Sequence, residues 1–380
     1  MRRRELLQGL GTIALSQLVL GCQPTSPTAL QVYLLQNALP PQLLGKARST
    51  AKEAPSLMLK AEISSLFEQL ELWQGKREIP WLSKLSEQLQ FWRRQPSLLS
   101  PRLVSLGDYW LAPAIQQKLI QPLDPQQLSH WSAVPPRWQA LVRRDRNGLL
   151  SPSGEVWGAP YRWGMTLIAY RPDKFKALGW TPTDWSDLWR PELKGQFSLP
   201  DQAREVIGLT LKTLGQSYNV ENPAQIKALA PQLRVLNQQV KFYDSTHYLE
   251  PLVMGDTWAA VGWSTDILPL LDQETELAVI APASGTSLWA DVWVQAANAK
   301  ISNSADLNTW INFWWQDEVA EAISRFTEGF SPLLQDFSTQ KGVLATLLTG
   351  NSTFEKSELL TPLSVSAEQE FQALWQQMRT

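Results

Sequence analysis

Glu205 occupies the position in this sequence that best suits ligand chemistry. The apolar run at 196–199 predicts a strand, Pro200 ends it, and Asp201 sits where a helix N-cap belongs. Apolar residues then recur at helical spacing over 203–214, so Glu205 lies in the first turn of a predicted helix. Turns of this kind, at the carboxyl ends of strands, are where α/β folds bind ligands. The helix macrodipole alone would also explain an acidic residue here.

A catalytic role for Glu205 would need a partner, and Asp291 is the candidate for an acid/base pair in a cleft. The sequence offers little else for catalysis. His130 and His247 stand in unpromising contexts, and there is no nucleophile elbow, phosphate-cradling glycine loop or metal-ligand spacing. Cys22 is the only cysteine, which excludes an intrachain disulfide and any Cys-based metal or redox site. We therefore expect no enzyme, no cofactor and no metal, with a hydrolase using paired carboxylates as the alternative.

Strand-like and helix-like segments alternate on both sides of Gly164, which predicts an α/β protein whose sheet is largely parallel in the first half. Predicted strands cover 30–35, 57–61, 102–105, 165–170, 196–199, 257–261, 277–280 and 291–297. Predicted helices include 109–119, 203–214, 223–240 and 307–314, and one that begins after Ser64. Most of the 19 tryptophans, Trp310 and Trp314 among them, are expected in the core, because tryptophan buries a large apolar area.

The amino-acid composition limits which classes of binding partner are expected. The chain has 380 residues, a net charge of −2, 18% charged and 44% hydrophobic residues, and is therefore globular, with one large core or two modest ones. A nucleic-acid partner is not expected, because a phosphate-binding face needs a clustered basic excess.

Residues 1–28 are interpreted as an export signal, lipobox and tether. The basic start contains Arg3-Arg4, which resembles a twin-arginine signal. The apolar stretch at 10–20 is too short to span a bilayer, and residues 18–21 before Cys22 resemble a bacterial lipobox. We expect export to the periplasm, with membrane attachment through lipidated Cys22 only. An ordinary cleaved signal with an incidental cysteine is the alternative.

Several short segments, in order, are similar to one family. They are Pro160-Tyr161-x-Trp163-Gly164, Asp187-Leu188-Trp189-x-Pro191-x-x-Lys194-Gly195 and Ala203-Arg204-Glu205-Val206. Over roughly 31–334 the chain resembles the spermidine/putrescine-binding proteins of bacterial ABC importers. The resemblance implies a monomeric, two-lobed periplasmic-binding-protein-like fold of type II that closes on its ligand and delivers a polyamine to membrane permease and ATPase subunits.

The resemblance also implies where the lobes divide. We expect one lobe from residues 29–165 plus 290–330 and the other from 166–289 plus 331–380. The chain would then cross between the lobes near 164–170 and 289–294.

The resemblance further implies the ligand-binding residues. Glu205 and Asp291 would accept ammonium groups, Trp289 and Trp263 would cover the methylenes, and Tyr109 is a weaker match. Simpler explanations are core tryptophans and, for Asp291, a carboxylate satisfied by backbone N–H groups at a strand end. Arg162 and Arg204 are expected to orient carboxylates or join helix to loop rather than touch a cationic ligand.

Departures from the family leave the ligand open. Gln202 stands where the family carries an aspartate, Phe330 where a tyrosine is common, and Gly107 where a serine is common. The loop at 35–38 also lacks the aromatic and hydroxyl residues that the family presents there. Another small solute, such as a monoamine or an amino-acid-like compound, is therefore the alternative to a polyamine.

Overall fold

The computed structural model describes residues 29–36, 38–76, 101–271, 276–297, 305–338, 342–349 and 352–380. The export signal, the lipobox with Cys22, and Asn37 of the 35–38 loop lie outside the described residues. Among the described residues, none of the helices has the length and apolar character needed to cross a membrane.

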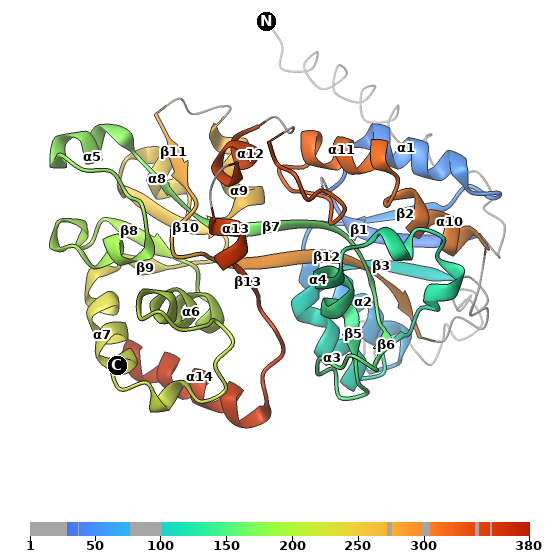
Figure 1. Ribbon diagram of the computed structural model, residues 1–380, viewed down its shortest axis with the longest axis horizontal. Helices are drawn as coiled ribbons and strands as arrows, with labels where there is room; N and C mark the ends of the chain where they lie inside the picture. The colour runs from blue at the N-terminus through green and yellow to red at the C-terminus, as the bar shows by residue number, and fades with distance from the viewer. Residues whose placement is uncertain are drawn as a thin grey trace, which may run out of the picture.

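Two α/β lobes lie side by side and are joined by two long strands, β7 and β12 (Figure 1). The strands are β1 Gln31–Leu35, β2 Ser56–Lys60, β3 Arg102–Gly107, β4 Ile120–Gln121, β5 Arg143–Arg144, β6 Glu155–Val156, β7 Ala159–Tyr170, β8 Phe197–Leu199, β9 Phe242–Tyr243, β10 Ala259–Trp263, β11 Ala278–Ile280, β12 Ser287–Ala296 and β13 Glu358–Leu359. The α/β fold expected from the sequence is confirmed.

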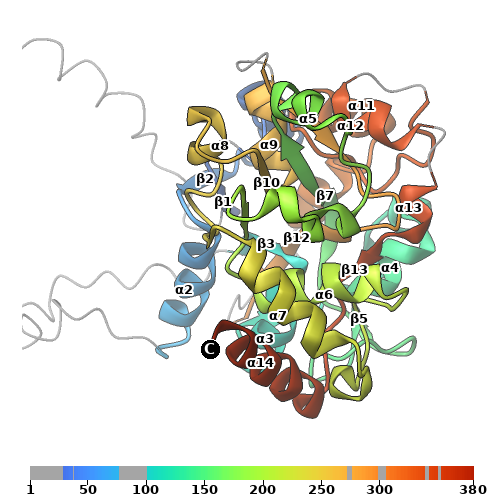
Figure 2. The same cartoon turned by 90° about the vertical axis from the view of Figure 1, so that its left-hand side faces the viewer.

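The helices flank the sheet in both lobes (Figure 2). The α-helices are α1 Pro41–Thr50, α2 Ile63–Trp73, α3 Leu111–Gln116, α4 Pro136–Val142, α5 Pro172–Leu178, α6 Ala203–Thr213, α7 Leu229–Gln239, α8 Glu250–Met254, α9 Ser264–Leu271, α10 Ala305–Phe313, α11 Asp317–Phe326, α12 Val343–Leu348, α13 Thr353–Lys356 and α14 Val365–Arg379. The 3-10 helices are η1 Asp108–Trp110, η2 Pro125–Gln127, η3 Trp131–Ala133, η4 Trp185–Trp189, η5 Pro191–Leu193 and η6 Pro223–Gln225.

One mixed sheet runs through both lobes in the order β2-β1-β3-β12-β7-β10-β8-β9. β7 belongs to both halves of it. Its residues 159–165 pair antiparallel with β12, whereas residues 166–170 pair antiparallel with β10 and β11. All twelve residues of β7 are buried, as expected for a strand covered on both faces. The backbone at the middle of the molecule is therefore fixed by hydrogen bonds to both lobes.

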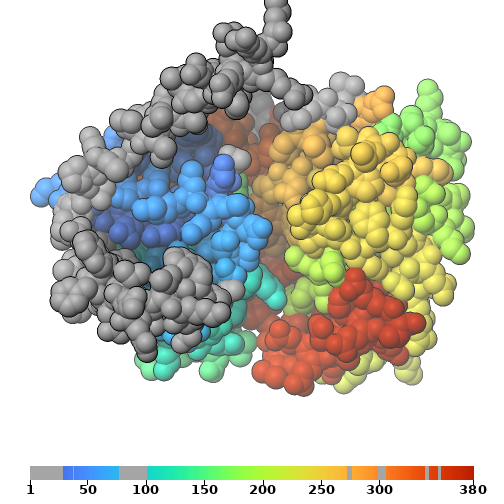
Figure 3. All heavy atoms as spheres, turned by 180° about the vertical axis from the view of Figure 1, so that it is seen from behind, coloured from blue at the N-terminus to red at the C-terminus, as the bar shows by residue number. Residues whose placement is uncertain are grey.

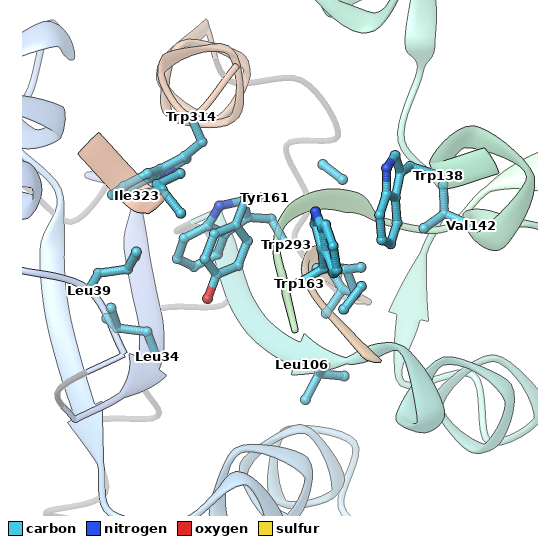
Figure 4. Close-up of a cluster of buried hydrophobic side chains, with 14 of the residues drawn as sticks. Leu34, Leu39, Leu106, Trp138, Val142, Tyr161, Trp163, Trp293, Trp314 and Ile323 are labelled. Atoms are coloured by element: carbon cyan, nitrogen blue, oxygen red, sulfur yellow. The ribbon is translucent and has the colours of Figure 1, made fainter. Parts of the chain in front are cut away.

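The core holds most of the tryptophans, as the composition suggested. Trp163, Trp293, Trp310 and Trp314 are fully buried, and Tyr161 stacks on Trp293 with ring centroids 4.5 Å apart (Figure 4). The prediction that Trp310 and Trp314 are core residues is confirmed. A second apolar cluster fills the other lobe, between β8, α6, α7 and α14. The first cluster also continues into this lobe along β7, β10 and α9, so the two lobes share part of their core.

Several predicted element boundaries are wrong. α6 begins at Ala203 with Gln202 at the N-cap, and Asp201 instead forms an ion pair with Arg379 of α14, at 2.9 Å. The predicted helix 223–240 is divided into η6 and α7, because Pro231 lies in the first turn of α7, where a missing N–H is tolerated. The predicted helix 109–119 is divided into η1 and α3, which ends before Lys118, whose φ of +57° lies in the left-handed region.

Candidate functional site

The candidate site lies where β7 and β12 run side by side in the middle of the molecule. The register pairs Asp291 with Arg162, Trp289 with Gly164 and Leu288 with Met165. Alternate residues of a strand share one face, so Arg162, Gly164 and Thr166 of β7 line one face of this strand pair. Ser287, Trp289 and Asp291 line the same face of β12. Viewed from behind, a furrow separates the two lobes at this level (Figure 3).

Asp291 forms a buried ion pair with Arg162. Its Oδ2 accepts hydrogen bonds from Nε of Arg162 at 2.9 Å and from Nη2 at 2.5 Å. The third nitrogen, Nη1, donates to the carbonyl oxygen of Ala38 at 2.7 Å. Arg162 is 6% exposed and Asp291 is 5% exposed. The pairing register shifts immediately after Asp291, a bulge of the kind that re-aims side chains beside binding sites. As expected from the sequence, Arg162 orients a carboxylate.

Asp108 lies beside this pair at the end of β3. Its Oδ1 accepts the backbone N–H of Ala290 at 2.9 Å, and its side chain is buried. Burial raises the pKa of Asp108 to about 6, although the Ala290 N–H and the charge of Arg144 oppose the shift. Asp291 contributes further to the raised pKa through like-charge repulsion.

Glu205 reaches the other end of the same face from the first turn of α6. Its Oε2 accepts hydrogen bonds from the hydroxyls of Ser287 at 2.6 Å and Thr166 at 3.2 Å. Neither bond uses Oε1. Glu205 is 4% exposed, and burial raises the pKa of its carboxyl, against the two hydroxyl bonds and the positive charge of Arg204. This carboxylate is therefore held by neutral hydroxyl donors.

The two acidic positions lie at opposite ends of one row. The Asp291–Arg162 pair and the side-chain contact between Ser287 and Thr166 are four residues apart along the strands, which is about 13 Å at the usual strand rise. Trp289 lies between them. A Cβ placed on Gly164 would come within 2.2 Å of Trp289 Cζ2, so the indole lies directly on the backbone of that glycine. Along this face the Asp291 carboxylate, the Trp289 indole and the Glu205 carboxylate follow one another, and we call these three side chains the ligand row.

Trp263 lies at the end of β10, next to the start of α9, and is partly exposed. Its backbone N–H donates to Tyr248 Oη at 3.2 Å, and that hydroxyl donates to Asp266 Oδ2 at 2.9 Å. The rings of Tyr248 and Trp263 meet edge to face, 6.0 Å apart. The Trp263 backbone is thus anchored while its ring is partly open to solvent.

The remaining candidates lie in different surroundings. Tyr109 on η1 is 63% exposed, and Gln202 is exposed at the N-cap of α6. Phe330 is 1% exposed and packs in the core against Trp163 and Phe337. The structure therefore brings Glu205, Trp289 and Asp291 onto one row and puts the Phe330 ring in the core.

Sequence reasoning missed the residues that fix the carboxylates. Thr166 and Ser287 hold Glu205, and Asp108 adds a third buried carboxylate near Asp291. A signal existed for one of them, because polar Thr166 interrupts an otherwise apolar stretch of β7. Within the described ranges, no group of three or more His, Cys, Asp or Glu side chains is arranged to hold a metal ion.

Comparison with known proteins gives the family. The model described as "Bacterial extracellular solute-binding protein" matches residues 101–353. The Spermidine/putrescine-binding periplasmic protein of Salmonella typhimurium is 29% identical over 222 residues, covering 58% of this chain and 60% of that protein. The chain thus spans about three fifths of the length of that curated relative.

Solved structures with the same fold extend over most of the chain. The Spermidine/Putrescine ABC Transporter Substrate-Binding Protein PotD from Streptococcus pneumoniae superimposes with a TM-score of 0.72 at 19% identity, covering 93% of this chain and 100% of that one. The Tp0655 (TpPotD) Lipoprotein of Treponema pallidum gives a TM-score of 0.67 at 17% identity, covering 92% and 99%. These likenesses establish the two-lobed periplasmic-binding-protein fold. The family match over residues 101–353 shows that this chain belongs to the family of bacterial extracellular solute-binding proteins.

Proposed function

We propose that this chain is an extracytoplasmic solute-binding protein that delivers an amine of the polyamine class to an ABC importer. The observation that carries the proposal is the row of Asp291, Trp289 and Glu205 on one face of the strands that join the lobes. A polyamine needs an aromatic surface for its methylenes and at least one carboxylate for its ammonium groups. Two of the similar proteins are named for spermidine and putrescine, which supports the same ligand class.

The other candidate residues complete this proposal. Trp263 and Tyr109 would cover the ligand from the rim of the furrow, because both rings are at least partly exposed. Gln202 would accept a hydrogen bond from a ligand ammonium, but its amide is uncharged and could not form an ion pair with it. Phe330 would act indirectly, by packing behind Trp163 in β7.

We assign one lobe to residues 29–165 plus 290–330 and the other to 166–289 plus 331–380. The change of β7 partners after Met165 supports this division. The packing of α14 on α6 and α7 supports the assignment of the C-terminal segment. Ligand bound between the lobes would favour the closed form.

The arrangement of Asp291 and Glu205 fits a binding site better than a catalytic site. Asp291 is committed to Arg162, and its position lies about 13 Å along the strands from the Glu205 contacts. Paired carboxylates in glycosidases are about 5–9.5 Å apart. A hydrolase with this pair is therefore disfavoured.

The residues before 29 would supply an export signal and a lipid anchor at Cys22. The permease and ATPase subunits of the importer would be the partners of this chain, which would act as a monomer.

A thermal-shift titration of the purified full chain tests this function. A ligand that binds only the folded state at one hundred times its Kd stabilises it by about 2.7 kcal/mol. We expect putrescine, spermidine or a related amine to raise the melting temperature, and Glu205→Gln to lose most of that rise. Sugars and amino acids serve as control ligands. A rise with those controls and none with any amine would refute the proposed ligand class.

A further inference from the structure

Arg162 already provides a cation for the carboxylate at one end of the proposed ligand row. Two of its nitrogens donate to Asp291 and the third to the Ala38 carbonyl. Its guanidinium carbon also lies 5.7 Å from the Trp289 ring centroid. A ligand ammonium at this end would meet the same carboxylate and the same indole face. Arg162 therefore makes, from within the chain, the interactions that a second ligand amine would make.

The arginine is held too firmly to give way to a ligand. Its side-chain stem packs under Gly329, where an added Cβ would lie 3.1 Å from Cγ and 3.3 Å from Cδ. The side chain is 8% exposed, and its bonds reach two separate segments, β12 and the residues before α1. Displacing it would leave a buried guanidinium unpaired, and an arginine cannot lose its charge by deprotonation. A competing amine would also have to be recruited from solution, whereas Arg162 is covalently attached.

The charged groups around the site differ in how they are paired. Carboxylates lie on Asp108, Glu205, Asp266 and Asp291, and guanidiniums on Arg144, Arg162 and Arg204. Arg144 interacts electrostatically with Asp108, and Arg162 with both Asp291 and Asp266. Arg204 lies near Glu205, but its Nη2 donates to Asn219 and its guanidinium faces the Phe371 ring. Arg204 also interacts electrostatically with Glu221 and Glu368. Among the described residues, Glu205 is thus held by the hydroxyls of Ser287 and Thr166, whereas Asp291 is hydrogen-bonded to an arginine.

We propose that Arg162 is a specificity-determining residue: it occupies Asp291, so the site engages one ammonium group of its ligand, at Glu205, and does not favour a diamine over a monoamine. This inference rests on the proposed function, since it concerns the same row. The ammonium donates to the Glu205 carboxylate, which its hydroxyl partners engage only through Oε2. The alkyl part of the ligand lies along Trp289 and ends against the neutral Arg162–Asp291 pair.

Calorimetric titration with n-butylamine and putrescine tests the proposal, because these probes share four carbons and differ in one ammonium. The full chain should bind both within about threefold of each other, since the second ammonium finds no free carboxylate. Arg162→Met keeps the apolar stem and frees Asp291, so putrescine should gain at least about tenfold over butylamine. Arg162→Lys keeps a cation near Asp291 and should retain the preference of the unaltered chain. Adding Asp291→Asn to Arg162→Met should abolish the gain.

The outcomes separate this proposal from the proposed function. If the unaltered chain binds putrescine at least about tenfold more tightly than butylamine, Arg162 does not restrict the site, although amine binding stands. A folded Arg162→Met protein without the putrescine gain also overturns the proposal. If the unaltered chain binds neither probe but Arg162→Met binds putrescine, the role of Arg162 is upheld and the polyamine function fails. Should Arg162→Met not fold, the selectivities of the unaltered chain and of Arg162→Lys decide the question.

Discussion

Replacing Glu205 by glutamine would remove one negative charge from the ligand row and leave the local shape almost unchanged. The glutamine oxygen can still accept the hydroxyls of Ser287 and Thr166, which now bond to Oε2. The charge-assisted bond to a ligand ammonium would be lost, which is worth about 1.5–3 kcal/mol. We expect amine affinity to fall by about ten- to 150-fold.

The same substitution should not destabilise the ligand-free protein at neutral pH. Burial raises the pKa of Glu205, so its ionised form is disfavoured in the folded state. A carboxyl with a raised pKa contributes stability that is present below its unfolded pKa of about 4.3 and is lost as the pH rises through the folded pKa. Glutamine does not carry this penalty. The variant should therefore melt at the same or a higher temperature than the unaltered chain at pH 7, and the difference should disappear below about pH 4.

The assay combines calorimetric titration with thermal melts of the ligand-free full chain between pH 4 and 8. Weaker amine binding together with unchanged or increased stability identifies Glu205 as a residue kept for the ligand. A variant that melts earlier at pH 7 but binds amines as tightly as the unaltered chain would refute the reasoning and make Glu205 a structural residue.

Four further predictions follow from the same geometry and from the N-terminal segment. Asp291→Asn should lower the free energy of unfolding in urea by about 3–5 kcal/mol, because it leaves the buried Arg162 guanidinium without its counter-ion; a loss below 1 kcal/mol would contradict a buried pair. Gln202→Asp should strengthen spermidine binding more than butylamine binding in calorimetry, since it adds an anionic anchor at the exposed start of α6; equal gains would count against a ligand position near Gln202. Cys22→Ala should move the protein from the membrane to the soluble fraction, and a variant still membrane-bound and fully processed would exclude lipidation there. Small-angle scattering should give a smaller radius of gyration with a saturating ligand, and an unchanged radius with a verified ligand would exclude hinge closure.

The local sequence pattern was sufficient to predict the strand and the helix that carry the site residues. The apolar run at 165–170 and the strand–turn–helix around Glu205 are both present, and the helix does put Glu205 in its first turn. The full length of β7 was not predicted, because Pro160 and Gly164 are typical strand breakers. Both are accommodated here by tertiary features. The register shift beside Asp291 brings Pro160 opposite Val292, and the indole of Trp289 lies on Gly164.

The partners of the carboxylates could not be predicted in this way. Asp291 and Arg162 are 129 residues apart, and Ser287 and Glu205 are 82 apart, so no local periodicity links them. The sequence did favour Arg162 as a residue that orients a carboxylate, but which carboxylate depends on strand register. Asp201 shows the same limit, because its pairing with Arg379 depends on where α14 packs.

The shared strand β7 has a consequence for how the chain reaches its native state. Its first half is hydrogen-bonded to β12, a strand that follows more than one hundred residues later, and β1 and β3 also rely on neighbours distant in sequence. Such long-range pairing makes loop-closure entropy a large part of the folding barrier, and folding correspondingly slow. The last helix, α14, covers α6 and α7 from the C-terminal end. One lobe therefore needs β12 and the other needs α14, so neither lobe can be completed until these late segments are available.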